Sequence, residues 1–203
     1  MRKFTYLLTM LALALGFSVA RADVVTPYAY DFSGLGSGKL VSSFAPPGWA
    51  HYVDRFQASS WGTPLFVEYF AQETGGYGDD GACLKVGSQN LYDSWSESSQ
   101  TMTDMIVTPA ITGDASIYVK QSDAEGSVSF YTCTVASDGT VTKGDKYEVT
   151  VPALSTDAWT KVELPNVAAG TRLGICGDQV LLDEFSAASA DVVLKRGMTI
   201  LSS

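Results

Sequence analysis

Residues 127–140 read SVSFYTCTVASDGT, a run that contains one strand and one turn. Its first part, residues 127–135, carries β-branched and aromatic side chains at the alternating spacing of a β-strand. Its second part, residues 137–140, supplies the small and polar side chains of a tight turn. This unit predicts an all-β fold if it recurs along the chain.

The unit recurs over most of the sequence. Further strands are predicted at 28–32, 65–70, 82–86, 104–107, 116–120, 147–151, 159–164, 171–176 and 180–185. Turn residues separate them at 142–145, 168–170 and 175–178, and no segment after residue 23 has a sustained helical period. About ten short strands at this spacing are typical of a two-sheet sandwich or a barrel.

Residues 1–22 have the pattern of an export signal. Arg2 and Lys3 precede a mostly apolar run from residue 6 to residue 17, and residues 20–22 have the small-x-small pattern of a cleavage site. The apolar run is shorter than the ~20 residues that span a bilayer. We therefore expect cleavage before Asp23 and a secreted, periplasmic or outer-surface location.

The composition is acidic. The net charge is −9, and loss of residues 1–22, which carry three basic and no acidic residues, lowers it to −12. Such a chain repels phosphate backbones and anionic lipids, which argues against nucleic-acid and membrane-surface partners. No later stretch has the length and hydrophobicity of a membrane span. The charge suits extracellular solubility or the binding of divalent cations, and it does not separate the two.

Neither the cysteines nor the single histidine forms a recognisable chemical motif. Cys83, Cys133 and Cys176 lie far apart and lack the spacing of a zinc site, so we expect buried, inert thiols, with one incidental disulfide as the alternative. His51 is the only histidine, and no GxSxG motif accompanies it. We expect no catalytic residue, although a glycan hydrolase with an unrecognised carboxylate pair remains a second alternative.

Aromatic residues offer candidate ligand platforms. They are concentrated between residues 44 and 70 and include tryptophans and tyrosines that could stack on sugar rings: Trp61, Trp95, Tyr52 and Tyr92. Packing in the core is the alternative for each tryptophan, because large aromatic side chains are mostly buried in sandwiches.

Three acidic residues are candidate metal ligands. Asp31 follows the first predicted strand, Asp79 lies in the glycine-rich segment 75–81, and Asp183 lies in the last strand of the domain. Calcium takes six to eight oxygen ligands, often from remote positions. A structural Ca²⁺ and ordinary solvated turns are both compatible with this pattern.

A series of short motifs resembles one known family. The motifs are, in order, 30–32 (YDF), 46–49 (PPGW), 81–84 (GACL), 105–111 (MIVTPAI), 159–164 (WTKVEL) and 181–185 (LLDEF). The series resembles the cleaved-adhesin, or choice-of-anchor J, jelly-roll domains of secreted Bacteroidetes proteins, which are similar to MAM and galactose-binding-like sandwiches. The resemblance covers about residues 28–187.

The resemblance implies an all-β, two-sheet jelly-roll β-sandwich over residues 23–187, preceded by the signal helix. Residues 188–203 are then a linker with an edge strand, or the start of a further domain. The resemblance also implies a structural Ca²⁺ held by Asp31 and Asp183, with Asp79 as a looser match. Trp49 belongs to the Pro-Gly-Trp motif and is expected to be structural. The second acid of the terminal pair is Glu184, a departure from the family.

The first functional expectation is a secreted or cell-surface binding and adhesion module without catalytic activity, which recognises a host protein or another extracellular polymer. The alternative is a carbohydrate-binding module of a glycan-degrading system that uses exposed aromatic side chains. Exposed rings in a groove would favour a glycan, and a flat polar face would favour a protein.

Overall fold

The computed structural model describes residues 27–33, 38–40, 46, 48–52, 55–56, 65–66, 70–79, 81–93, 98–103 and 105–192. Side chains are described for all of these except 38–40, 55–56, 65–66, 70–73, 79, 88–93 and 98–103. The predicted export signal and residues 193–203 lie outside the described residues. Within the described residues we find no helical segment with the length and hydrophobicity of a membrane span.

Strands dominate the described residues, and η2 (Tyr77–Asp79) is a single 3-10 turn. The strands are β1 (Tyr28–Tyr30), β2 (Gly38–Leu40), β3 (Ala50–Tyr52), β4 (Arg55–Phe56), β5 (Leu65–Phe66), β6 (Phe70–Thr74), β7 (Ala82–Val86), β8 (Ser88–Asp93), β9 (Ser98–Thr103), β10 (Met105–Val107), β11 (Ala110–Gln121), β12 (Ser127–Val135), β13 (Val141–Lys146), β14 (Thr160–Asp178) and β15 (Val180–Asp191). The strand predicted at 127–135 is confirmed with the same bounds.

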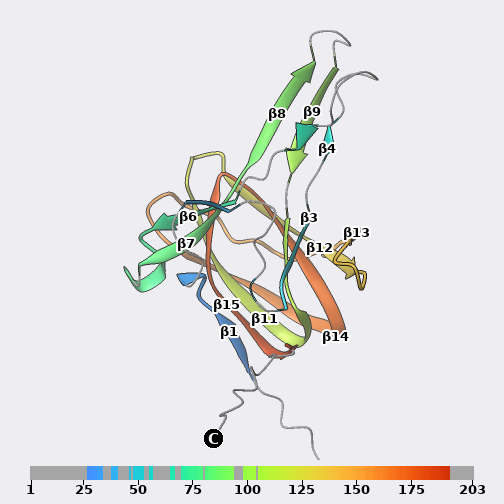
Figure 1. Ribbon diagram of the computed structural model, residues 1–203. Helices are drawn as coiled ribbons and strands as arrows, with labels where there is room; N and C mark the ends of the chain where they lie inside the picture. The colour runs from blue at the N-terminus through green and yellow to red at the C-terminus, as the bar shows by residue number, and fades with distance from the viewer. Residues whose placement is uncertain are drawn as a thin grey trace, which may run out of the picture.

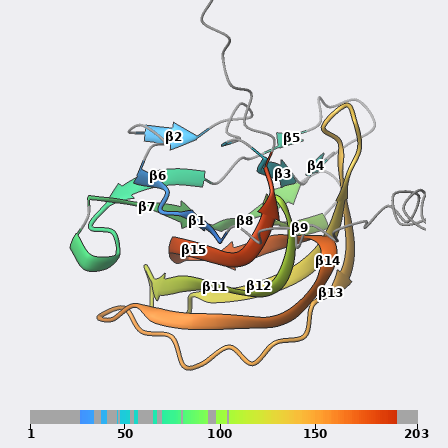
Figure 2. The ribbon, with the colours of Figure 1, turned by 90° about the horizontal axis from the view of Figure 1, so that it is seen from below.

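Two antiparallel sheets share the long strand β14. The first sheet has the order β2-β6-β7-β15-β11-β14, with β1 also paired to β15, and the second has the order β13-β12-β14-β10-β3. β14 pairs with β11 up to residue 171 and with β12 from residue 172 onward. Figures 1 and 2 show β14, in orange, as a long curved strand. The prediction of an all-β, two-sheet jelly-roll β-sandwich is confirmed.

Two smaller hairpins complete the described strands. β4 pairs with β5, and β8 pairs with β9. The β8–β9 hairpin extends away from the two sheets (Figure 1). The connection between β6 and β7, drawn in green, contains η2 and curves over one end of the first sheet.

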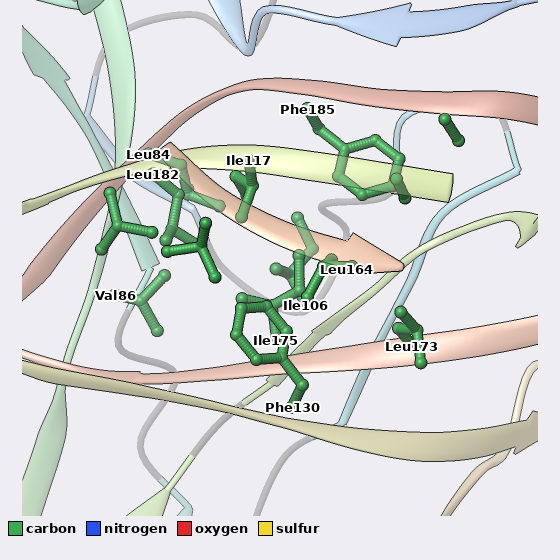
Figure 3. Packing of buried hydrophobic residues seen from close by; sticks show 14 of the residues in the cluster. Leu84, Val86, Ile106, Ile117, Phe130, Leu164, Leu173, Ile175, Leu182 and Phe185 are labelled. Atoms are coloured by element: carbon green, nitrogen blue, oxygen red, sulfur yellow. The ribbon is translucent and has the colours of Figure 1, made fainter. Parts of the chain in front are cut away.

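The core lies between the two sheets and follows from side-chain alternation. Ile117 of β11 and Leu164 of β14 face it from the first sheet, and Phe130 of β12 and Ile175 of β14 face it from the second (Figure 3). All four are fully buried, and a buried side chain of this kind contributes about 1.5–3 kcal/mol. Because successive side chains of a strand point to opposite faces, their neighbours form the outer faces of the sheets.

An aromatic cluster closes one end of the core. The Trp49 side chain is 5% exposed, and its ring centroid lies 5.4 Å from that of Phe32 and 5.1 Å from that of Phe185. Its indole Nε1 donates a hydrogen bond of 2.7 Å to the Tyr28 hydroxyl. A buried indole N–H with a partner is the usual requirement for a structural tryptophan. The predicted structural placement of Trp49 is confirmed.

Several local predictions were wrong, among them the turns predicted at 168–170 and 175–178, which lie within β14. Residues 147–151 form no strand. The Tyr147 amide still donates to the Phe130 carbonyl at 2.9 Å, but the chain then leaves the sheet, with Val149 and Val151 packed against the core. The turn predicted at 142–145 lies instead within β13. A Cβ on Gly144 would stand 2.6 Å from Thr132 Oγ1, so this glycine marks a close approach between strands rather than a turn.

The expected linker after residue 187 is also replaced by a strand. β15 continues to Asp191, which pairs with Ala110 of β11. The small side chains that suggested a linker suit the sheet, because Ser186 Oγ lies 2.9 Å from Ser116 Oγ and Ala187 is 5% exposed. The predicted domain boundary at 187 therefore falls inside a strand.

The three cysteines are buried thiols, as expected. Cys133 and Cys176 lie on the outer face of the second sheet, in a small apolar cluster with Met105 and Val107. Burial raises the pKa of the Cys133 thiol. Because the reactive form of cysteine is the thiolate, a buried thiol with a raised pKa is chemically inert.

Candidate binding site on the outer face of the first sheet

The candidate site is centred on an irregularity in β15. Ser186 pairs with Ser116 of β11, but Asp183 pairs with Tyr118, so β15 has one extra residue in this interval. Glu184 has a φ of 47°, an unusual value for a residue with a side chain, and it accommodates the extra residue as a β-bulge. As a result Leu182 and Phe185 both face the core, whereas Asp183 lies beside Tyr118 on the outer face.

The Asp183 carboxylate attaches a loop to this face. It is fully buried, and it accepts hydrogen bonds from the Tyr77 amide at 2.7 Å and from the Glu184 amide at 2.8 Å. Hydrogen bonds to a charged group contribute about 1.5–3 kcal/mol each. The loop is able to bend over the sheet because Gly78 has a φ of 71° inside η2, a conformation that favours glycine. Asp183 therefore fixes the position of Tyr77.

Three aromatic side chains, which we call the aromatic ledge, meet above the sheet: Tyr77, Tyr118 and Trp159. The Tyr77 and Tyr118 ring centroids are 3.9 Å apart with an interplanar angle of 33°, and the Tyr77 and Trp159 rings meet edge to face at 6.5 Å. Tyr118 and Trp159 are half-buried. Tyr77 is 37% exposed. Among the side chains that the structure describes, no other large hydrophobic residue is exposed.

Charged groups surround the ledge. Lys161 lies directly opposite Tyr118 in the β11–β14 ladder, and its Nζ is 2.7 Å from a Glu163 carboxylate oxygen. The hydrogen bond to Glu163 raises the pKa of Lys161. A hydrogen bond with the Tyr118 side chain raises the pKa of Tyr77, and the charge of Glu184 acts in the same direction. Tyr77 therefore remains a neutral phenol at neutral pH.

A small open pocket lies next to the ledge, on the other side of Glu184. It has a volume of about 230 Å³ and is lined by Ala29, Tyr30, Asp31 and Glu184. Burial, followed by the neighbouring Tyr28 and Asp31, raises the pKa of Tyr30 to about 12. The pocket is smaller than the roughly 300–1,000 Å³ typical of small-molecule sites. Two carboxylates, those of Asp31 and Glu184, line this pocket together.

The structure separates the predicted metal ligands. The first and last strands are neighbours as expected, since β1 pairs with β15. Asp31 is exposed and accepts a hydrogen bond of 3.1 Å from the Ser33 amide, while the Asp183 carboxylate is directed to the Tyr77 loop. Asp79 lies in η2, and its side chain is outside the description. In the described part of the chain no three His, Cys, Asp or Glu side chains gather around one point. The Ca²⁺ site remains a prediction.

The predicted aromatic platforms do not include the ledge. Trp61 and Trp95 lie outside the described residues, and Tyr92 lies in β8 with its side chain outside the description. Tyr52 is half-buried and packs against the apolar cluster on the second sheet. In the segment 75–81 (GGYGDDG), which contains Tyr77, the sequence pattern predicts metal ligands and not an aromatic platform. An aromatic residue between glycines was the available signal, because flexible loops often present binding residues.

Similarity to known proteins is found in structure and not in sequence. No protein-family model matches the sequence, and the comparison with curated proteins gives no match. Solved structures similar to this chain include the K2 cleaved adhesin domain of Lys-gingipain, with 9% identity and a TM-score of 0.44, covering 80% of this chain and 99% of that one. Cleaved adhesin domains, the family that the sequence motifs resemble, are thus among these structures.

Two carbohydrate-binding modules are also similar. The CBM22-1 xylan-binding domain of Paenibacillus barcinonensis Xyn10C has 14% identity and a TM-score of 0.37, covering 70% of this chain and 87% of that one. The C-terminal family 22 module of Clostridium thermocellum Xyn10B has 10% identity and a TM-score of 0.40, covering 75% and 93%. At these identities and TM-scores neither a ligand nor a residue role follows from the similarity.

Proposed function

We propose that this chain is a non-catalytic binding module of an exported protein and that it binds an extracellular polysaccharide on the aromatic ledge. The observation that carries the proposal is the exposed Tyr77 ring, which is held over the sheet by two independent contacts. Its backbone amide is bonded to Asp183, and its ring is stacked on Tyr118. A ring that is both exposed and already fixed in place can contact a ligand without the entropic cost of ordering it.

Such a ring suits a sugar for physical reasons. The apolar C–H face of a pyranose packs on the flat face of an aromatic ring, and a ring that is already fixed loses little conformational entropy on binding. Lys161, Glu163 and Glu184 surround the ring with hydrogen-bonding groups. Sugar hydroxyls both donate and accept hydrogen bonds, so this mixed border matches them.

Adhesion to a host protein, the first expectation from the sequence, is less well supported. A stable protein–protein interface buries about 800 Å² per partner, and large aromatic or Arg anchors supply much of its energy. Among the described side chains the exposed large hydrophobic residue is Tyr77. One small apolar platform with a polar border fits a chain of sugars better than it fits a protein surface.

The test compares the effect on binding of removing a tyrosine ring from each of the two sheets. Tyr77→Ala removes the ring but keeps the backbone amide that bonds to Asp183, so the loop anchor is preserved. Tyr131→Ala is the matched control, because Tyr131 is half-buried on β12, with Lys143 Nζ 3.9 Å from its ring centroid. Binding is measured by affinity electrophoresis against a panel of soluble polysaccharides, followed by calorimetry on those that retard the protein.

We expect the wild type and Tyr131→Ala to bind the same polysaccharide equally well. Tyr77→Ala is expected to lose at least about tenfold in affinity, the loss typical of a central contact residue. Absence of binding to every polysaccharide, or undiminished affinity of a folded Tyr77→Ala protein, contradicts the proposal.

A further inference from the structure

Two lysines occupy the outer face of the first sheet next to the aromatic ledge, and a third lies in line with them. Val119 faces the core, so Lys120 points to the same outer face as Tyr118, two residues further along β11. Lys161 lies opposite Tyr118 on β14. Lys120 pairs with Leu181 of β15, and Leu181 pairs with Lys85 of β7. We call Lys85, Lys120 and Lys161 the basic row.

The basic row contrasts with the rest of the chain. The net charge of the protein is −9, and yet two lysines lie next to the aromatic ledge on β11 and β14, with a third in line with them on β7. Lys120 forms no ion pair within the part of the chain that the structure describes. Lys161 is paired with Glu163, but both side chains are exposed, at 46% and 62%, and such a surface pair is weak and easily rearranged. Ammonium groups are therefore available to a ligand that lies on Tyr77.

Glu163 is paired with Lys161, and three further acidic groups, those of Asp31, Asp183 and Glu184, lie toward the other end of this face. Asp31 and Glu184 line the pocket beyond the bulge, and the buried Asp183 carboxylate has its oxygens directed to two backbone amides. The face is thus polarised, with lysines on the side of the ledge away from the pocket.

We propose that the aromatic ledge and the basic row together bind an acidic saccharide, whose ring stacks on Tyr77 and whose carboxylate or sulfate contacts Lys120 and Lys161. This inference rests on the proposed function and specifies the ligand class. The ammonium groups attract an anionic ligand and do not attract a neutral sugar in this way. The charged ligand therefore binds more tightly. Salt weakens the preference, because both lysines lie at the surface and about 10 Å is the screening length at 0.1 M.

The experiment uses ligands that differ only in charge. Polygalacturonate is compared with its fully methyl-esterified form, which has the same backbone without the negative charge, and dextran sulfate is compared with dextran. The first pair reports on a carboxylate and the second on a sulfate. Affinities are measured for the wild-type protein at low and high salt, and for Lys120→Gln and Lys161→Gln.

Lys146→Gln is the matched control. Lys146 pairs with Glu148 at 3.3 Å, two residues along the chain, as Lys161 pairs with Glu163, but it lies in β13 at the edge of the second sheet. Its side chain is 55% exposed, compared with 46% for that of Lys161. The variant therefore makes the same change in net charge away from the ledge.

We expect the charged member of one pair to bind about tenfold more tightly than its neutral counterpart at low salt. Lys120→Gln and Lys161→Gln should each lose about fivefold for the charged ligand only, and Lys146→Gln should behave as the wild type. Equal affinity for charged and neutral members, or equal effects of Lys120→Gln and Lys146→Gln, overturns the inference while the proposed function stands. Binding to no polysaccharide overturns the proposed function and this inference with it.

Discussion

Two groups of aromatic side chains lie on opposite faces of β15, and they have different fates. The inner group, around Trp49, Phe32 and Phe185, is buried in the core and closed by the Trp49–Tyr28 hydrogen bond. The outer group, the aromatic ledge, is held through the backbone of Tyr77 and leaves one ring exposed. The bulge at Glu184 separates them, since it sends Phe185 inward while Asp183 faces outward.

The comparison shows that the surroundings of an aromatic side chain decide its role. Trp49 is fixed by packing on all sides, so its removal leaves a cavity that the rigid sandwich cannot fill. The Tyr77 ring packs against Tyr118 and the edge of Trp159 and is 37% exposed, so its removal leaves no enclosed cavity. The inner group therefore stabilises the fold, and the outer group is available to a ligand.

The largest expected effect is on the inner group. Trp49→Ala should lower the free energy of unfolding by about 3–5 kcal/mol, the usual cost of deleting a packed tryptophan. Urea denaturation followed by far-UV circular dichroism measures it. Under conditions where the variant is folded, its affinity for the polysaccharide should be unchanged. A Trp49→Ala variant with wild-type stability and no binding would contradict this assignment, because it would place ligand binding in the inner group.

A smaller effect is expected from metal removal. The predicted Ca²⁺, if it joins β1 and β15 through Asp31 and Asp183, adds about 2.7 kcal/mol at 100-fold its dissociation constant. A chelator should then lower the thermal unfolding midpoint of the wild type and leave that of Asp183→Asn unchanged. An unaffected wild-type midpoint would contradict a Ca²⁺ site at Asp183.

Much of the fold was predictable from local patterns. The strand at 127–135 and the pairing of the first and last strands follow from alternation and from the order of the motifs. The patterns failed where tertiary contacts override local chemistry. Gly144 has turn chemistry but serves a close approach to Thr132, and residues 147–151 alternate because they pack on the core outside any ladder.

The candidate site was less predictable, because it depends on a change of register. Simple alternation along 180–185 gives Asp183 and Phe185 the same face, and only the extra residue at Glu184 separates them. The density of aromatic residues pointed to Tyr52, which is packed on the second sheet, and away from Tyr77, an isolated ring in a glycine-rich loop. The periodicity of a sequence does not indicate which strand a loop will pack against.

The central claim is that the exposed ring of Tyr77 is the binding platform, and one calorimetric series tests it most directly. Tyr77→Phe keeps the ring, its packing against Tyr118 and the amide bonded to Asp183, and it removes the hydroxyl together with its hydrogen bond to Tyr118. We expect Tyr77→Phe to bind the polysaccharide within about twofold of the wild type and Tyr77→Ala to lose at least about tenfold. Equal binding by all three proteins, or equal losses in both variants, would contradict the claim.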